Sequence, residues 1–229
     1  MSEAKKKRPM PGEKQDELLS FFEIELRGFS RLTGIFIEAL AKADLKIDES
    51  VINSSEVTAV FGLLAIASHI VGCFSDLIKS NKTYSAAALT RQLIEIEYLI
   101  WSFSNDRSNA KKWVEEKREI RMKNFRTKVI RNSSSGLFPD SDYSAHCELG
   151  GHPTPSGFIL LLNRNEDKYA LVCDVVGHSW GIVQHLRIWG EKSPFFADPF
   201  LSRIAAIDDL VSKNFAQYAI TNLDRVNLP

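Results

Sequence analysis

The chain has few cysteines and no excess of charge of either sign. Its 229 residues include three cysteines, Cys73, Cys147 and Cys173, none of which belongs to a C-x-x-C pair. An odd number of isolated cysteines argues against a disulfide framework and favours a reducing compartment, so we expect a cytoplasmic protein. Lys and Arg together number 29, as do Asp and Glu. A net charge of zero excludes a global field that would steer the whole molecule to nucleic acid or membrane.

The sequence also lacks an uninterrupted apolar segment of the kind that spans a bilayer. Its most apolar stretch, residues 57–78, contains Ser68, His69 and Asp76, which are costly at the centre of a membrane. We interpret this stretch as a buried core helix and predict no membrane association.

No apolar segment follows the basic run KKKR near the N-terminus, which is therefore not a secretory signal. We interpret residues 1–13 as a flexible basic tail; a nuclear-import signal is the alternative, which the shortness of the run disfavours. The remaining residues, 14–229, contain no repeat and no low-complexity linker. With 44% hydrophobic residues, they are expected to form one domain with a substantial core.

Hydrophobic periodicity predicts an all-α fold, a bundle of six or seven helices. The segment 84–104 is apolar on nearly every side, so it should be the central helix. Between helices, the Pro- and Gly-rich segment 152–157 cannot be helical. Residues 158–162 and 169–172 could pair as one small β-hairpin, or the second of these segments could equally begin the next helix. The expected helices cover residues 14–43, 54–79, 84–104, 107–131, 140–150, 170–189 and 199–221.

Two charged residues stand out in the predicted central helix. Arg91 and Glu95 are four residues apart and therefore share one face. In a sheltered helix, an arginine and a glutamate must pair with each other or with other polar groups. They either line an internal polar site or form an ordinary surface pair, and the sequence favours neither alternative.

A second group of reactive side chains lies in YSAHCELGGHPTPSG, residues 143–157. Tyr143 and His152 are its main candidates, and the glycines and prolines around His152 hold the backbone rigidly, as functional sites require. The same pattern is also that of a tight helix-to-loop turn, which is the preferred interpretation for His152. We nevertheless select Arg91, Glu95, Tyr143 and His152 as the candidate catalytic residues of one polar pocket, with His152 as its acid or base.

The sequence provides no standard metal-binding motif. His146, Cys147, Glu148 and His152 are potential ligands, but no H-x-x-x-H, E-x-x-H or C-x-x-C pair accompanies them. His178 and His185 are seven residues apart, about 10 Å along a helix, and cannot bind one ion together. A metal site would need ligands from separate elements, so we assign no metal ligand and predict no cofactor. P-loop and G-x-G-x-x-G motifs are likewise missing.

Ten basic residues against three glutamates mark the predicted helix 107–131. Such a segment could bind a phosphate backbone. Its charges do not fall on one face, however, and Trp113 and Phe125 are better explained as core anchors than as base-stacking platforms. A solvated helix is the preferred interpretation over a nucleic-acid interface.

Two motifs resemble all-helical bacterial families that have no assigned activity. They are R-x-x-x-E, and Y-x-x-x-C-E-x-x-x-H-P over the middle third of the chain (Arg91, Glu95, Tyr143, Cys147, Glu148, His152 and Pro153). The resemblance implies a helical fold and a shared pocket rather than a reaction. Distantly similar helical domains include HEPN ribonucleases, whose arginine is followed four to six residues later by a histidine; this chain lacks that pair.

Three classes of function follow from the sequence. The working hypothesis is a bacterial binding or effector protein with the polar pocket described above, in phage defence or stress response. The second is a hydrolase or nuclease, metal-assisted or HEPN-like, that uses Glu95 and His152. The third is a homodimeric interaction protein that pairs through the phenylalanine-rich stripe of residues 14–43.

Overall fold

The computed structural model describes residues 55–192 together with Ser202, Ala205, Ala206 and Asp209. The predicted tail at 1–13, the predicted first helix at 14–43 and most of the predicted last helix at 199–221 lie outside these residues. Within the described part, every regular element is helical, so the predicted all-α class is confirmed.

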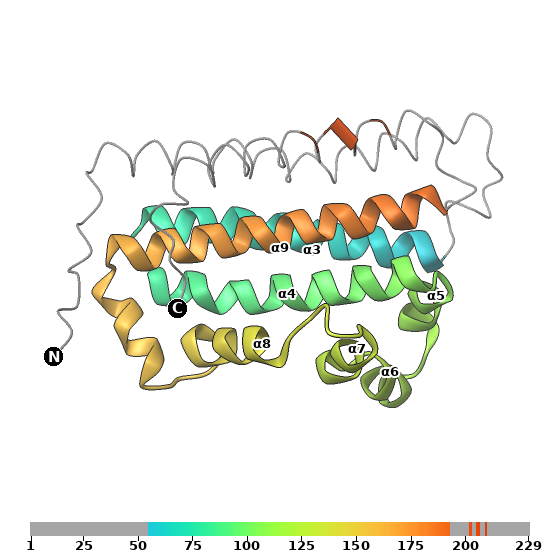
Figure 1. The fold of residues 1–229 in the computed structure, drawn as a ribbon, viewed down its shortest axis with the longest axis horizontal. Helices are drawn as coiled ribbons and strands as arrows, with labels where there is room; N and C mark the ends of the chain where they lie inside the picture. Colours follow the sequence, from blue (N-terminus) through green and yellow to red (C-terminus); the bar gives the residue numbers. More distant parts are fainter. Residues whose placement is uncertain (1–54, 193–201, 203–204, 207–208, 210–229) are drawn as a thin grey trace, which may run out of the picture.

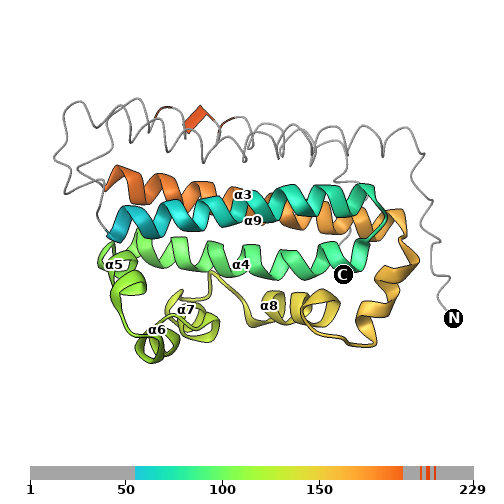
Figure 2. The same cartoon turned by 180° about the vertical axis from the view of Figure 1, so that it is seen from behind.

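Three long helices form the body of the bundle. They are α3 (Ser55–Lys79), α4 (Thr83–Asn105) and α9 (Asn165–Glu191), and α4 packs against both of the others (Figures 1 and 2). A tight turn joins α3 to α4, with Asn81 in the left-handed conformation at φ 56°, which Asn tolerates better than most residues. The start of α3 and the bounds of α4 agree with the predicted ones to within one residue.

The core lies where these three helices meet. Phe74, Phe103 and Trp189 are fully buried there, one from each long helix. Removing such side chains from water is the main stabilising contribution to the fold, about 1.5–3 kcal/mol for each large apolar residue. Helix α4 contributes buried residues around most of its circumference, which confirms its predicted central place.

Helix α3 is long and apolar enough to cross a membrane by length and composition, with a mean hydropathy of 2.1 over its most apolar window. Half of that window is buried inside the protein, where α3 packs on α4 and on α5 (Ser108–Glu115). This packing is what the prediction of a core helix requires.

The prediction of one helix over 107–131 is wrong. The segment forms three short helices, α5, α6 (Arg118–Asn124) and α7 (Thr127–Ser133), separated by extended residues at Glu116–Lys117 and Arg126. In one straight helix, Trp113, Phe125 and Ile130 would point about 100–140° apart. The two bends allow all three to pack against the core clusters.

The predicted hairpin is also wrong. Residues 158–162 belong to a 3₁₀ helix, η2 (Ser156–Leu162), and residues 169–172 lie inside α9, which begins five residues earlier than predicted. The segment 152–157 was predicted to be non-helical. Residues 152–155 are, but Ser156 and Gly157 already belong to η2. A tertiary contact explains the turn between the two helices. Asn163 adopts a left-handed conformation, and its Oδ1 accepts hydrogen bonds from the N–H and hydroxyl of Thr83 at 3.2 and 2.9 Å.

The predicted short helix at 140–150 consists of two parts. An α-helix, α8 (Asp140–His146), continues as a π-helix, η1 (Cys147–Gly151), and the helix ends at the predicted Gly-Gly pair. Gly150 lies directly against α4. A Cβ atom at Gly150 would be 2.6 Å from the backbone atoms C of Ala87 and N of Ala88, so only glycine permits this approach.

Candidate functional site

The structure brings the four predicted site residues together. Arg91 and Glu95 project from α4, Tyr143 from α8, and His152 follows η1. The Arg91 Nε atom donates to Glu95 Oε1 at 3.2 Å and to Tyr143 Oη at 3.1 Å, while Arg91 Nη1 lies 3.3 Å from His152 Nε2. The Tyr143 hydroxyl donates to Glu95 Oε1 at 2.8 Å. We call these four residues the Arg91 cluster; their convergence is a fact of the structure, and their catalytic role remains a prediction.

The charges in the Arg91 cluster are internally balanced. Arg91 and Glu95 form an ion pair, with side chains 29% and 40% exposed. Burial alone would lower the pKa of Arg91, but its hydrogen bond to Tyr143 and the neighbouring anionic groups raise it. Burial raises the pKa of Tyr143, which keeps the phenol protonated as the donor to Glu95.

This cluster joins three parts of the chain. Arg91 simultaneously contacts its own helix, α8 and the segment after η1. Gly151 lies beside it, since a Cβ atom there would be 3.0 Å from Arg91 Cδ. The Arg91 cluster therefore holds α8 and η1 at a fixed position on α4.

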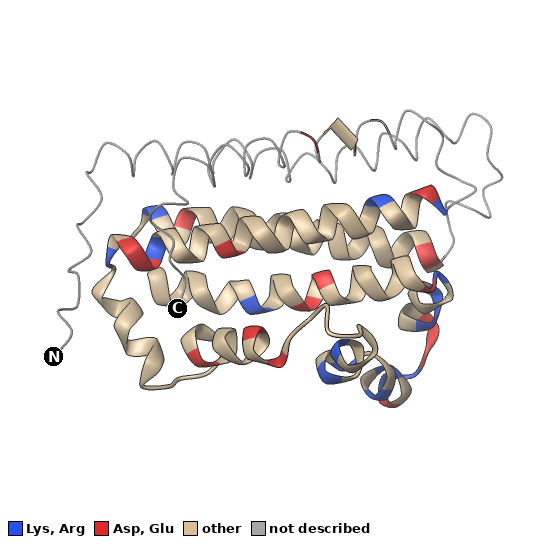
Figure 3. Ribbon diagram, in the orientation of Figure 1, with Lys and Arg blue, Asp and Glu red and all other residues tan. Residues whose placement is uncertain are grey.

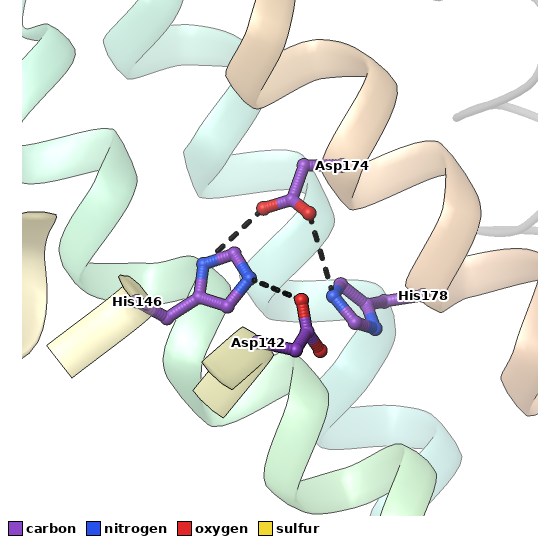
Figure 4. A group of neighbouring side chains, drawn as sticks. All are labelled: Asp142, His146, Asp174 and His178. Atoms are coloured by element: carbon purple, nitrogen blue, oxygen red, sulfur yellow. Dashed lines mark ion pairs between the residues drawn. The ribbon is translucent and has the colours of Figure 1, made fainter. Parts of the chain in front are cut away.

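A second group of polar residues lies between α8 and α9 (Figure 4). Asp142 and His146 are one turn apart on α8, and Asp174 and His178 are one turn apart on α9. Each offers one ligand atom, and the four atoms all lie within 4.8 Å of one another. We call this group the Asp–His quartet.

The contacts inside the quartet link the two helices. His146 is at its centre, with Nε2 3.5 Å from Asp142 Oδ1 and Nδ1 3.3 Å from Asp174 Oδ2. The other Asp174 oxygen lies 3.5 Å from His178 Nε2. These separations are longer than those of strong hydrogen bonds.

A buried glutamate orients one of the imidazoles. Glu97 Oε2 on α4 lies 2.6 Å from His178 Nδ1, and the Glu97 side chain is only 11% exposed. Paired in this way, His178 presents Nε2 to the quartet, the arrangement in which an outer carboxylate fixes a metal-binding histidine. Gly181 provides the space, because a Cβ atom there would be 1.9 Å from Glu97 Oε1.

Negative charge predominates around the quartet, where Asp142, Asp174 and Glu97 face two imidazoles. Burial alone would lower the pKa of His178, but hydrogen bonds with Asp174 and Glu97 outweigh it and raise the pKa to about 10. Burial raises the pKa of Glu97, opposed by its bond to His178, whereas the hydrogen bond with His146 lowers the pKa of Asp142. The surroundings thus favour a positive charge at this point.

The donor set fits a divalent transition metal. Two imidazoles with two carboxylates suit Zn²⁺, Mn²⁺, Fe²⁺ or Co²⁺ better than Ca²⁺ or Mg²⁺, which prefer oxygen ligands alone. His146 is buried and His178 is nearly so, at 7% and 14% side-chain exposure, while Asp142 is 38% and Asp174 27% exposed. The carboxylates therefore form the solvent side of the group.

The quartet was not predicted from the sequence. Among its members only His146 was grouped with other potential ligands, namely Cys147, Glu148 and His152, and the metal motifs considered were pairs of histidine, glutamate and cysteine. The overlooked signal is a repeated D-x-x-x-H, at 142–146 and 174–178, which places an aspartate and a histidine on one face of each helix. His185 lies apart from this group, edge-on to Phe138. None of the three cysteines forms a disulfide bond.

Comparisons with protein-family models, curated proteins and solved structures gave no match to this chain.

Proposed function

We propose that this protein binds one divalent transition-metal ion through the Asp–His quartet and uses it to activate water for hydrolysis. The observation that carries the proposal is the convergence of four ligand atoms from two helices within 4.8 Å. Each helix supplies one aspartate and one histidine at i,i+4 spacing, so the ligands come from rigid elements, as precise sites require.

Two features support metal binding over an incidental polar cluster. The first is the outer contact from Glu97 to His178, which costs desolvation of a carboxylate and is accommodated by a glycine at position 181. The second is charge, since the two aspartates of the quartet balance a divalent cation, and the proton that His178 holds at neutral pH would be released as the ion binds.

The ligand number supports a role in hydrolysis. Four protein ligands complete the shell of a tetrahedral Zn²⁺ but leave one or two positions for water on a five- or six-coordinate ion such as Mn²⁺ or Fe²⁺, and the partly exposed Asp142 lies on the solvent side of the group. A bound divalent ion lowers the pKa of such a water well below that of bulk water, which makes hydroxide accessible nearer neutral pH.

Calorimetric titration tests the metal half of the proposal. Zn²⁺ or Mn²⁺ is titrated into the chelator-treated full chain, and we expect one ion per chain. Asp174→Asn and His178→Ala should weaken binding by about tenfold or more. The matched controls Asp76→Asn and His69→Ala change exposed residues on α3 and should leave binding intact. Equal binding by all five proteins, or none by the unaltered chain, would contradict the proposal.

Activity of the metal-loaded protein tests the second half. We expect hydrolysis of a chromogenic phosphodiester, bis(4-nitrophenyl) phosphate, that is lost on chelation and in Asp174→Asn but retained in Asp76→Asn. Stoichiometric metal binding without hydrolysis of this ester or of 4-nitrophenyl acetate would reject the hydrolase and leave a metal-binding protein.

The Arg91 cluster supports a second candidate, a binding or effector protein that acts in bacterial defence or stress response. Its support is the convergence of Arg91, Glu95, Tyr143 and His152. Growth of bacteria that express the chain tests it, beside Glu95→Ala and His152→Ala forms of equal abundance. Growth arrest by the unaltered chain alone supports an effector, and equal growth of all three contradicts it. The homodimer hypothesis concerns residues 14–43, and a strict monomer in light scattering would reject it.

A further inference from the structure

The segment 117–128 concentrates positive charge on an otherwise neutral chain. It contains six Lys or Arg residues and a single acidic residue, Glu119. The bend between α6 and α7 falls within it. Figure 3 shows the resulting gathering of basic residues on these two helices.

Five of these cations are exposed and have no carboxylate partner among the described residues. We refer to this group, which is defined by its charge and exposure along α6, α7 and the residues beside them, as the basic face: Lys117, Arg118, Lys123, Arg126 and Lys128. Cations elsewhere in this half of the bundle are paired instead. Arg107 binds Glu56 at 2.6 Å, and Arg131 binds Asp140 at 2.6 Å. Unpaired like charges repel one another, so their concentration is unfavourable for stability unless a polyanion neutralises them.

The basic face adjoins the helix that carries half of the quartet. Helices α6, α7 and α8 follow one another along the same side of α4 (Figures 1 and 2), and both α7 and α8 pack on it. Arg131, at the end of α7, links α7 to α8. It pairs with Asp140, and its Cζ atom lies 4.6 Å from the centroid of the Tyr143 ring. Asp142 of the quartet lies between these two α8 residues.

We propose that the basic face binds the phosphodiester backbone of a nucleic acid, which makes nucleic acid the substrate class of the metal centre. The hydrolytic part rests on the proposed function above, whereas binding by α6 and α7 does not. In the reaction, the oxygen of the activated water forms a bond to phosphorus and the bond from phosphorus to one sugar oxygen breaks. That sugar oxygen takes up a proton, which leaves a phosphate monoester and a hydroxyl group.

The composition of the face indicates contact with phosphates rather than bases. It has no exposed aromatic side chain for base stacking, because Phe125 is half-buried against the core. Its exposed apolar residues are Ile120, Met122 and Val129. Two seven-residue helices with these three residues lack the continuous bulky apolar face by which amphipathic helices enter a membrane. Binding should therefore be independent of base sequence and sensitive to salt.

Fluorescence anisotropy of the full chain with labelled 20-nucleotide single strands, DNA and RNA, tests this inference. The buffer contains EDTA, so the result does not depend on the metal site. Lys123→Gln with Lys128→Gln should weaken binding about tenfold or more at low salt and reduce the slope of log K against log salt by about 1.4. The matched control is Lys79→Gln with Lys82→Gln, at the α3–α4 turn at the opposite end of the bundle (Figure 1). It should bind like the unaltered chain.

Each other result overturns the inference or part of it. Absence of oligonucleotide binding, or equal weakening by both double variants, rejects the basic face. Binding to vesicles that contain phosphatidylserine, without binding to oligonucleotides, assigns the face to membranes instead. If oligonucleotides bind but the metal-loaded protein does not cleave them, the basic face is still a nucleic-acid-binding site. The proposal that nucleic acid is the substrate of the metal centre is then rejected.

Discussion

Individual residues at the site show how far spacing along a helix can specify chemistry. Asp142 with His146, and Asp174 with His178, are each one turn apart, so each pair shares a face before any tertiary contact forms. The same spacing places Arg91 beside Glu95. The spacing within one pair does not determine which other pair it will meet, because the second pair lies on another helix, 28 residues or more away.

Gly181 offers a direct test of the contact between Glu97 and His178. Gly181→Ala places a Cβ atom 1.9 Å from Glu97 Oε1, so the carboxylate must move away. We expect a loss of roughly 1–3 kcal/mol in the free energy of unfolding and about tenfold weaker metal binding. Denaturant titration and calorimetry measure the two effects.

Gly177→Ala, one turn earlier on α9, is the control for that substitution. A Cβ atom at position 177 meets nothing within 4 Å. It should therefore stabilise the helix by about 0.5–1 kcal/mol. Equal stability of the two variants would show that Glu97 does not need the space at position 181.

Because the His185 side chain is partly buried, without a hydrogen-bond partner at Nδ1 among the described residues, we expect the free energy of unfolding to fall in acid. Burial lowers its pKa to about 4, and its unfolded pKa is about 6.5. Between these values the unfolded chain binds a proton that the folded chain excludes. The free energy of unfolding therefore falls as the pH drops from 6.5 to 4, by on the order of 2–3 kcal/mol.

Urea denaturation at several pH values, with His185→Phe for comparison, measures this contribution. The variant removes the titrating group and keeps an aromatic ring beside Phe138. Its stability should fall less than that of the unaltered chain over this pH range. Parallel decreases in the two proteins would exclude His185 as the cause.

At the scale of elements, the long helices were predictable and the short ones were not. In helices α3 and α4 the apolar residues follow helical spacing and stop at a recognisable turn. Their apolar side chains pack in the core as that spacing predicts. Between residues 107 and 162, local pattern and tertiary contact disagree. Trp113, Phe125 and Ile130 can all reach the core only if the helix bends twice, and the turn at Asn163 is fixed by Thr83, 80 residues away.

The junction of η1 with α4 provides the test at this scale. Gly150→Ala puts a Cβ atom 2.6 Å from backbone atoms of Ala87 and Ala88, and backbone cannot move aside as a side chain can. We expect a loss of about 3 kcal/mol in the free energy of unfolding, measured by denaturant titration. The control, Gly72→Ala, is exposed on α3 with nothing within 4 Å. If both variants unfold alike, η1 does not depend on this close approach.

For the whole molecule, metal binding should appear as added stability. An ion that binds only the folded chain stabilises it by about 2.7 kcal/mol at a free concentration of 100 times Kd. For a chain of this size, that energy raises Tm by roughly 5–10 °C. Thermal denaturation with Zn²⁺ or Mn²⁺, then with excess EDTA, measures the shift. Asp174→Asn should show no increase, and an equal increase in that variant would place the ion elsewhere.

The sequence by itself determined the helical class, the central place of α4 and the faces on which Arg91, Glu95 and the D-x-x-x-H pairs lie. These are consequences of helical periodicity and burial, which depend on neighbours within a few residues. Only the tertiary structure decided which faces meet. It bent the segment 107–131, replaced the expected hairpin with helices, and brought Asp142 and His146 against Asp174 and His178. Such contacts depend on the packing of helices distant in sequence, with glycines at positions 150 and 181 allowing the close approach, and no local pattern contains that information.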